Sequence, residues 1–286
     1  MTKEHMNKIP ERKDASHKGD YGKVLIIAGS RGMTGAAYLA SQGALLAGSG
    51  LVTCGVPGSL NVIMEIKLTE VMTLALPETK NAALSMKGAE KIITFSAGCD
   101  AAAIGPGLGR EEETGKLVKE LLERMDIPVV LDADGINALK SGGSILKGRN
   151  APTVITPHPG EMARFLGIDA GKVQADREGI AKKVSEETGC IVCLKGHKTV
   201  VASPDGEIYI NSTGNSGMAT GGTGDVLTGM ITSFIGQGVN AYSAAVNAVY
   251  LHGLAGDIAA SKKGAFSMTA TDILDNLHEA FERSGI

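Results

Sequence analysis

The sequence predicts an α/β protein with three layers, in which helices cover both faces of a mostly parallel sheet. Short apolar runs rich in Val, Ile and Leu alternate with helical patterns, which is typical of parallel sheets built from β–α units. The 39 glycines suit the tight turns that join such units. Only residues 199–211 break the rhythm, because two short strand-like runs there flank Ser203-Pro-Asp-Gly206. That composition predicts an antiparallel hairpin at one side of the sheet.

The elements of the first half of the chain follow from its apolar runs. A helix of small residues over 35–47 is expected to pack closely on the sheet, and a charged helix is expected over 111–125. The predicted strands cover residues 23–28, 51–56, 71–76, 101–105 and 129–132.

The second half begins with strands over 153–156 and 191–195, which flank an exposed helix over 176–188. The hairpin strands follow at 199–202 and 207–211, and the chain is mostly helical from about residue 222. The apolar stretch 241–260 contains Asn247, His252 and Asp257, so it predicts a core helix and not a membrane span, with a histidine in the core. Because no linker, repeat or low-complexity tract interrupts residues 1–286, we expect a single domain.

Charge and composition exclude several classes of protein. The net charge is −3, and no long run of Lys or Arg appears, which disfavours a broad nucleic-acid surface. Residues 1–20 are polar and contain no apolar segment, so neither a signal peptide nor a membrane anchor is expected and the expected location is cytoplasmic. Cys190 and Cys193 have metal-ligand spacing, but they fall in a strand-like run that would turn their thiols to opposite faces. A structural role is therefore expected for both.

The strongest site motif is Asn215-Ser-Gly-Met-Ala-Thr-Gly-Gly-Thr-Gly-Asp225, which leads directly into an apolar helix. Glycines 221, 222 and 224 allow backbone amides to converge at a helix N-terminus, which is an anion site. A carboxylate beside bound phosphate is electrostatically unfavourable, so Asp225 is interpreted as a base that deprotonates an attacking hydroxyl. The alternative is a flexible loop in which Asp225 caps the helix.

Two further glycine-rich loops follow predicted strands. Gly29-x-x-Gly32-x-x-Gly35 differs from the dinucleotide fingerprint, and no acid ends the next strand. The small residues after Gly32 therefore allow either close approach of a ligand or only a tight turn. Gly105-Pro-Gly-Leu-Gly109 either cradles a ligand with its amides or is a plain β–α turn.

Polar residues lie at the ends of three other strands. His158 and Glu161 belong to a proline-rich turn, where a lone histidine is more often structural than functional. The segment 195–199, Lys-Gly-His-Lys-Thr, offers cations and a hydroxyl to phosphate, or is a solvated turn. Asp132 and Asp134 either hold Mg²⁺ through water or, for Asp134, cap the next helix.

These motifs together resemble a known family. The Gly-Gly-Thr-Gly-Asp run at 221–225 resembles the anion-hole and base motif of ribokinase-like kinases. Five further segments, in chain order, resemble the ADP-dependent (S)-NAD(P)H-hydrate dehydratase family, and the resemblance runs from about residue 16 to 281. Those segments are residues 16–22, 29–37, 132–137, 156–161 and 195–199.

The resemblance implies a three-layer ribokinase-like fold and a repair enzyme. Such an enzyme phosphorylates the ring hydroxyl of hydrated NADH or NADPH (NADHX or NADPHX), using ADP or ATP with Mg²⁺, and then eliminates phosphate to restore the cofactor. It also implies a homo-oligomer, often a tetramer, that works with a separate NAD(P)H-hydrate epimerase. The epimerase domain fused to some members is not expected in this chain.

The resemblance also implies roles for particular residues. Asp225 is the base, and the turn formed by Gly222, Thr223 and Gly224 stabilises the transferring phosphoryl group. Glu161 helps to organise Mg²⁺ through water. His158 stands where sugar kinases of the superfamily have Asn, which disfavours sugar phosphorylation and suits substrate binding. The other implied substrate contacts are Ala36 or Ala37, Gly107 and Asp225, and the implied nucleotide contacts are Lys195, Gly196, His197, Lys198, Thr199 and Gly224.

Two rival functions remain at this level. The first is a small-molecule kinase of the same superfamily, acting on a vitamin-precursor alcohol and releasing a stable phosphoester. The second is a non-catalytic nucleotide-binding or regulatory protein, which would need the glycine loop but not a base at Asp225. For the segment Ser16–Gly22 the sequence suggests no physical role.

Overall fold

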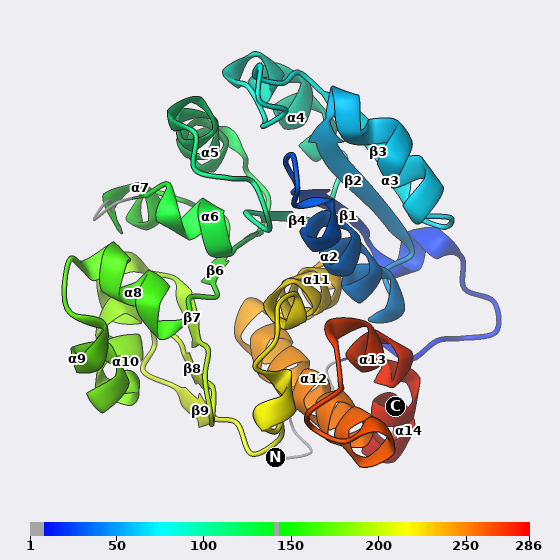
Figure 1. Cartoon of the computed structure of the whole chain (residues 1–286), viewed down its shortest axis with the longest axis vertical. Coiled ribbons are helices and arrows are strands. Elements are labelled where there is room, and N and C mark those ends of the chain that lie inside the picture. The colour runs from blue at the N-terminus through cyan, green and yellow to red at the C-terminus, as the bar shows by residue number, and fades with distance from the viewer. Residues whose placement is uncertain (1–8, 140–142) are drawn as a thin grey trace.

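The computed structural model describes residues 9–139 and 143–286, and in this part of the chain one nine-stranded sheet forms the centre. The strand order is β3-β2-β1-β4-β5-β6-β7-β8-β9, and helices lie on both sides of the sheet (Figure 1). The three-layer α/β/α fold with a mostly parallel sheet, predicted from the sequence, is therefore confirmed.

All nine predicted strands are present, each within two residues of its predicted bounds. The seven strands from β3 to β7 in the sheet order are parallel to their neighbours, whereas β7–β8 and β8–β9 are antiparallel. Gly206 closes the predicted β8–β9 turn by donating its amide to the Ser203 carbonyl at 3.1 Å. The strands are β1 Lys23–Ile27, β2 Leu51–Pro57, β3 Met72–Leu76, β4 Ala101–Ile104, β5 Val129–Leu131, β6 Thr153–Ile155, β7 Ile191–Leu194, β8 Val200–Ala202 and β9 Ile208–Ile210.

Helices from the two ends of the chain cover one face of the sheet, and helices from the middle cover the other. The period-2 geometry of a strand separates the two cores: Val24 and Ile26 of β1 face one, and Leu25 and Ile27 face the other. The first face carries α2 Thr34–Leu46, α3 Asn61–Lys67, α11 Thr223–Gly236, α12 Ala241–Lys263, α13 Ala270–Asp275 and α14 Leu277–Ser284. The second carries α4 Ala89–Ser96, α5 Glu112–Arg124, α6 Ala133–Asn137, α7 Gly143–Lys147, α8 Pro159–Leu166, α9 Ala170–Ala175 and α10 Arg177–Thr188.

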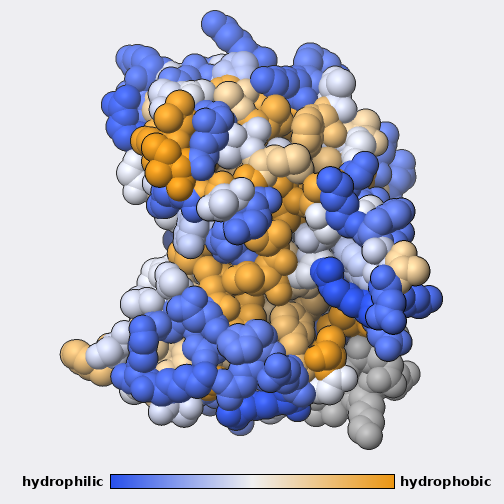
Figure 2. Space-filling view, turned by 90° about the vertical axis from the view of Figure 1, so that its right-hand side faces the viewer, coloured by the Kyte–Doolittle hydropathy of each residue, from blue (hydrophilic) through white to orange (hydrophobic). Residues whose placement is uncertain are grey.

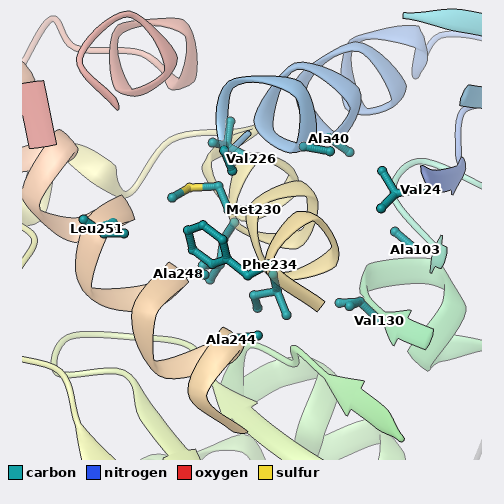
Figure 3. Packing of buried hydrophobic residues seen from close by; sticks show 14 of the residues in the cluster. Val24, Ala40, Ala103, Val130, Val226, Met230, Phe234, Ala244, Ala248 and Leu251 are labelled. Carbon is teal, nitrogen blue, oxygen red and sulfur yellow. The ribbon is translucent and has the colours of Figure 1, made fainter. Parts of the chain in front are cut away.

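The central helix α11 is held by an unusually close crossing with α2. A Cβ on Gly229 would lie 2.0 Å from the Ala40 carbonyl oxygen, and a Cβ on Gly43 would lie 2.5 Å from that of Val226. On its other side, the Met230 and Phe234 side chains lie between α11 and α12 (Figure 3). The small-residue helix predicted over 35–47 therefore packs on α11 as well as on the sheet, and this fixes where α11 begins.

The segment Ser16–Gly22, for which the sequence suggested no role, has a structural one. It forms a 3₁₀ turn whose N-cap is His17, and the His17 Nδ1 accepts a hydrogen bond from the Gly19 amide at 3.1 Å. A Cβ on Gly50 would lie 1.7 Å from the Lys18 carbonyl oxygen, so the turn presses directly against the start of β2. The motif lies at the amino ends of β1 and β2. It is therefore at the opposite edge of the sheet from the one that the carboxyl ends of the strands form.

Two further expectations about buried groups are confirmed. Cys193 belongs to the core on the α11 side and Cys190 to the core on the α5 side, so the two thiols do not converge on a metal. The stretch predicted as a core helix is α12, in which His252 is 7% exposed. Among the helices of residues 9–139 and 143–286, none combines the length and apolar character needed to cross a bilayer.

Candidate active site

The start of α11 forms the centre of the candidate site, in the middle of the molecule (Figure 1). Gly222 is the N-cap, with φ of 95°, and a Cβ there would lie 2.3 Å from the Leu39 Cδ1 atom. Only glycine satisfies both conditions. The first helical hydrogen bond is made by Val226, whose amide donates to the Gly222 carbonyl. The preceding amides of Thr223, Gly224 and Asp225 are therefore the orphan donors of the helix N-terminus, as an anion hole requires.

The Thr223 hydroxyl holds this turn with its proton. It donates to the carbonyl oxygens of Met218 at 3.0 Å and Thr220 at 3.2 Å. The segment before the turn is fixed by Asp257 of α12, which accepts from the Gly214 amide and the Asn215 side chain. Hydrogen bonds therefore hold the glycine-rich loop at both of its ends, at Gly214 and Asn215 and at Thr223.

Asp225 has the proton affinity expected of a base that works near neutral pH. Burial is the main reason that its pKa rises from 3.8 to about 7, and the negative charges of Asp132, Glu161 and Asp134 raise it further, while Lys195 opposes the rise. The N-cap of α11 is Gly222, and Asp225 lies in the first turn of the helix, so Asp225 is not its N-cap. Because the most efficient general bases have a pKa near the working pH, this carboxylate suits proton abstraction.

A buried ion pair places a cation beside the anion hole. The Lys195 Nζ lies 2.7 Å from the Asp132 Oδ1, and a Cβ on Gly224 would lie 3.1 Å from that Nζ. Asp132 is 1% exposed, and it also accepts from the Thr156 hydroxyl at 2.7 Å and the Thr228 hydroxyl at 2.9 Å. These three contacts orient the carboxylate, which holds the Lys195 ammonium in one position beside the anion hole.

The same contacts decide what the acidic residues can do for a metal. Asp134 does not cap α6, so that alternative is wrong, and it accepts instead from the Gly109 amide at 3.0 Å. Glu161 accepts from the His158 amide at 2.8 Å. In residues 9–139 and 143–286 no three His, Cys, Asp or Glu side chains converge as a metal cluster. These carboxylates therefore suit an ion held through water better than one bound directly by the protein.

His158 is both a helix cap and an exposed donor. Its Nδ1 accepts from the amides of Gly160 and Glu161 at 3.0 and 3.3 Å, so the proton of the neutral ring is on Nε2. Burial is the main cause that lowers the pKa of His158, which keeps the ring neutral at pH 7. The side chain is 50% exposed, and its Nε2 lies 3.4 Å from the Glu161 Oε1, so a ligand that reaches this nitrogen also meets that carboxylate. The structural and the binding interpretations are thus compatible.

Two loops after neighbouring strands bring Ala36 and Gly107 together. Gly107 has φ of 62°, and a Cβ there would lie 2.9 Å from the Ala36 Cβ. The Ser30 hydroxyl ties the loops by donating to the Gly107 carbonyl at 2.9 Å. Ala37, by contrast, is fully buried beneath Gly29. Of the two alanines, only Ala36 is partly exposed, so only Ala36 has surface to offer a ligand.

A cavity of about 750 Å³ adjoins the anion hole and includes the whole segment 195–199. The turn is shaped by Gly196 and Lys198, which have φ of 145° and 56°. Arg177 of α10 braces it by donating to the His197 carbonyl. The Lys198 and His197 side chains are exposed at the rim, whereas Lys195 lies inside. This volume and lining suit a nucleotide whose phosphates point toward α11.

Several residues of the site were missed by the sequence reasoning. The far wall of the cavity is formed by Asn211, Thr213, Leu227, Val249 and His252, which lie in or beside apolar runs and carry no motif. Burial lowers the pKa of His252 to about 4, so it lines the cavity as a neutral ring. Thr228 was also missed, although a hydroxyl in the middle of an apolar helix is a signal that a buried partner exists.

Known proteins resemble this chain over nearly its whole length. The family model described as NAD(P)H-hydrate dehydratase matches residues 24–279. The bifunctional NAD(P)H-hydrate repair enzyme of Moorella thermoacetica is 51% identical over 271 residues, which cover 95% of this chain and 51% of that protein. The ADP-dependent (S)-NAD(P)H-hydrate dehydratase of Bacillus subtilis is 36% identical, and the match covers 99% of this chain and 97% of that one.

Solved structures agree with this assignment. The ADP/ATP-dependent NAD(P)H-hydrate dehydratase of Bacillus subtilis, crystallised with ATP and Mg²⁺, superposes with a TM-score of 0.83 at 35% identity and covers 99% of this chain. A ribokinase-like protein of Enterococcus faecalis gives 0.83 at 25% identity. The chain spans about half the length of the bifunctional relatives that it matches. The anion hole, the carboxylate beside it and these similarities together show that the chain belongs to the NAD(P)H-hydrate dehydratase family.

Proposed function

We propose that this protein is an ADP-dependent (S)-NAD(P)H-hydrate dehydratase, which restores NADH or NADPH from the hydrated cofactor. The observation that carries the proposal is that Asp225, whose pKa rises to about 7, directly follows the orphan amides at the start of α11, where the Lys195 ammonium lies next to Gly224. That arrangement joins a base to an anion hole. The names of the relatives, which are ADP-dependent dehydratases and repair enzymes, support this substrate and this donor.

The first chemical step is phosphoryl transfer to the ring hydroxyl. Asp225 takes the hydroxyl proton while the oxygen attacks the terminal phosphorus of ADP, and the bond from that phosphorus to the AMP oxygen breaks. The amides of Thr223, Gly224 and Asp225 stabilise the charge on the phosphoryl oxygens. Lys195 lies next to Gly224, so it neutralises the same charge.

The second step is elimination. Phosphate leaves the ring carbon with the bonding electrons because the ring nitrogen donates its lone pair, and a proton is lost from the adjacent carbon, which restores the double bond. Hydroxide is a far poorer leaving group than phosphate, which is why a phosphoryl donor is needed. Ala36, Gly107 and the His158 Nε2–H hold the ring in this proposal, and their positions around the Gly107 loop and the start of α8 support it.

The nucleotide occupies the 750 Å³ cavity in this proposal, with the segment Lys195-Gly-His-Lys-Thr199 and Gly224 at its phosphates. Oxygen donors suit Mg²⁺, and the carboxylates of Asp132, Asp134 and Glu161 all lie close enough to Asp225 to raise its pKa. Because each already accepts hydrogen bonds, we propose that Glu161 contacts the ion through water. When bound, Mg²⁺ neutralises phosphate charge.

The direct test mixes the protein with hydrated NADH, ADP and Mg²⁺ and follows the return of the reduced-nicotinamide absorbance. We expect AMP and phosphate to appear in equal amounts with the restored cofactor. Absence of recovery with both ADP and ATP would refute the proposal.

The base assignment has its own variant. Asp225→Asn keeps the shape of the side chain but cannot accept the proton, so we expect turnover to fall by at least about 100-fold while nucleotide binding persists. Asp205→Asn, at the exposed β8–β9 turn, is the matched control and should retain full activity. Full turnover in Asp225→Asn would remove Asp225 from the role of base.

The rival function is phosphorylation of a small vitamin-precursor alcohol. A kinase would release a phosphoester that mass spectrometry detects, whereas the dehydratase releases free phosphate and the dehydrated ring. The solved hydroxyethylthiazole kinase of Pyrococcus horikoshii shares only the fold, at 16% identity and a TM-score of 0.62. The dehydratase is therefore favoured.

We also propose that the whole of residues 1–286 acts as one domain in a homo-oligomer. The face that carries α3 and β3 shows a band of apolar surface (Figure 2), and Val62, Ile63 and Ile66 are 62%, 44% and 80% exposed. Exposed apolar groups beside an open sheet edge favour association with a second copy. Light scattering tests this, because Ile66→Glu should reduce the measured mass if α3 lies in the interface.

The setting of the reaction follows from its substrate. We propose that the enzyme works in the cytoplasm on NADHX and NADPHX and cooperates with an NAD(P)H-hydrate epimerase, which supplies the (S) form. The bifunctional repair enzymes among the relatives support this partnership. Adding a purified epimerase should let the protein consume both epimers instead of one.

A further inference from the structure

A second cavity shares no lining residue with the nucleotide site. It has a volume of about 540 Å³ and is bounded by the first turns of α5, by α6 and by α8. Its apolar wall includes Leu108, Val118, Ile136 and Phe165, which are all buried. Nothing in the phosphoryl-transfer chemistry described above uses this cavity.

The cavity adjoins the reaction centre through two shared residues. Gly109, which lines it, belongs to the same loop as Gly107, and the Gly109 amide donates to the Asp134 Oδ2 at 3.0 Å. Asp134 lines the cavity and is close enough to Asp225 for its charge to raise the pKa of Asp225. A ligand held at Gly107 can therefore extend past Gly109 and Asp134 without leaving the protein surface.

Two guanidinium groups line the cavity. Arg164 donates through Nε to the Asn137 Oδ1 at 2.9 Å, and Arg110 places its Nε 3.4 Å from the Asp134 Oδ1. These contacts orient the side chains through Nε alone. Among the described residues the terminal nitrogens of both groups make no hydrogen bond, so they remain free for the bidentate contacts that guanidinium makes with phosphate.

The proposed substrate has a part for which the reaction centre offers no place. The hydrated ring is one half of a dinucleotide, and the other half is adenosine joined through two phosphates. That half needs cations for the phosphates, apolar surface for the adenine and acceptors for the ribose hydroxyls. The cavity offers Arg110 and Arg164, apolar surface at the half-buried Gly115, Ala138 and Lys119 stem, and the carboxylates of Asp134 and Glu111.

We propose that the α5–α6–α8 cavity binds the adenylate half of the substrate, with Arg110 and Arg164 at its two phosphates. This inference rests on the proposed function and names where the rest of the substrate lies. It assigns the two cavities to different nucleotides: the one beside Lys195 holds the phosphoryl donor, and the one beside Asp134 holds the substrate.

The test compares the hydrates of NADH and of the reduced nicotinamide mononucleotide, which lacks the adenylate half. We expect the wild-type kcat/KM for the dinucleotide to exceed that for the mononucleotide. In the double variant Arg110→Met/Arg164→Met that ratio should fall about 10- to 100-fold, as expected for loss of charge-assisted hydrogen bonds. Both side chains are exposed, so the variant should fold. Arg124→Met, on the outer surface of α5, is the control and should keep the wild-type ratio.

A binding measurement supplies a readout besides activity. With AMP filling the donor site, NADH fluorescence should report a Kd about 10- to 100-fold higher in the double variant than in the control. An unchanged ratio and an unchanged Kd in the double variant would overturn the assignment of the cavity. Failure of the wild type to restore either hydrate would instead refute the proposed function, so the two failures are distinguishable.

Discussion

The Asp132–Lys195 pair makes a sharp prediction about the pH dependence of catalysis. The substitution Asp132→Asn keeps the size of the side chain but removes the negative charge 2.7 Å from the Lys195 ammonium. After burial, Asp132 is the largest cause of the raised pKa of Asp225. Removing it lowers that pKa, and releasing Lys195 toward Asp225 lowers it further, so both effects have the same sign.

The size of the effect can be worked out from the titration of Asp225. Loss of a neighbouring like charge shifts a pKa by about 1 unit or more, which moves the acidic limb of kcat/KM from about pH 7 to about pH 6. The ionised fraction at pH 6 then rises from about one tenth to about one half. The activity at pH 6 relative to pH 8 should therefore increase about fivefold, although the maximum rate falls because Lys195 is no longer fixed.

The assay is the recovery of reduced-nicotinamide absorbance between pH 5 and 9. Thr228→Val is the matched control, because it removes a hydrogen bond to the same carboxylate without changing the charge. We expect its acidic limb to stay near pH 7. Breaking the buried pair should also cost about 3–5 kcal/mol of stability, which thermal unfolding detects. An acidic limb that stays in place or moves upward in Asp132→Asn would refute the electrostatic reasoning.

Three other predictions follow from the same contacts. Lys195→Met should reduce kcat by about 10²- to 10³-fold, the effect typical of losing one group that stabilises transition-state charge, and unchanged turnover would contradict its position beside Gly224. Asp225→Asn should be more stable than the wild type by about 1–3 kcal/mol at pH 8 and equally stable near pH 4. The reason is that the pKa of Asp225 is raised to about 7 in the native state, so the wild-type native state loses stability as the pH rises from 4 to 8. Equal unfolding temperatures of the two proteins at pH 8 would count against the raised pKa. Gly229→Ala should lower stability by about 1–3 kcal/mol because its Cβ would meet the Ala40 carbonyl at 2.0 Å, whereas Gly115→Ala, with its nearest atom at 3.8 Å, should unfold at or above the wild-type temperature.

Most of the fold could be predicted because its signals are local. Short continuous apolar runs located the strands, and the change of rhythm at Ser203–Gly206 located the antiparallel edge. Short helices such as α3 and α8 were not predicted, since elements of seven or eight residues carry little periodicity of their own. Burial against the sheet stabilises them, and burial depends on the completed fold.

The residues of the candidate site also fall into those that the sequence predicted and those that it did not. A glycine-rich turn before an apolar helix, ending in a carboxylate, indicated the anion hole and the base at Asp225, because that chemistry depends on residues adjacent in sequence. The role of Asp132 was not predictable: its partners Thr156, Lys195 and Thr228 are 24, 63 and 96 residues away. A side chain that completes an ion pair over such a separation leaves no local pattern.

The sequence by itself thus determined the fold class, the position of the anion hole and the family to which the chain belongs, because backbone conformation and spacing encode each of them locally. Tertiary structure alone decided that Asp132 forms an ion pair with Lys195, that Ala36 and not Ala37 is partly exposed, and that a second cavity adjoins the site. The physical reason is that charge pairing, burial and cavity shape depend on which distant segments meet. Only the packed sheet and its helices bring those segments together.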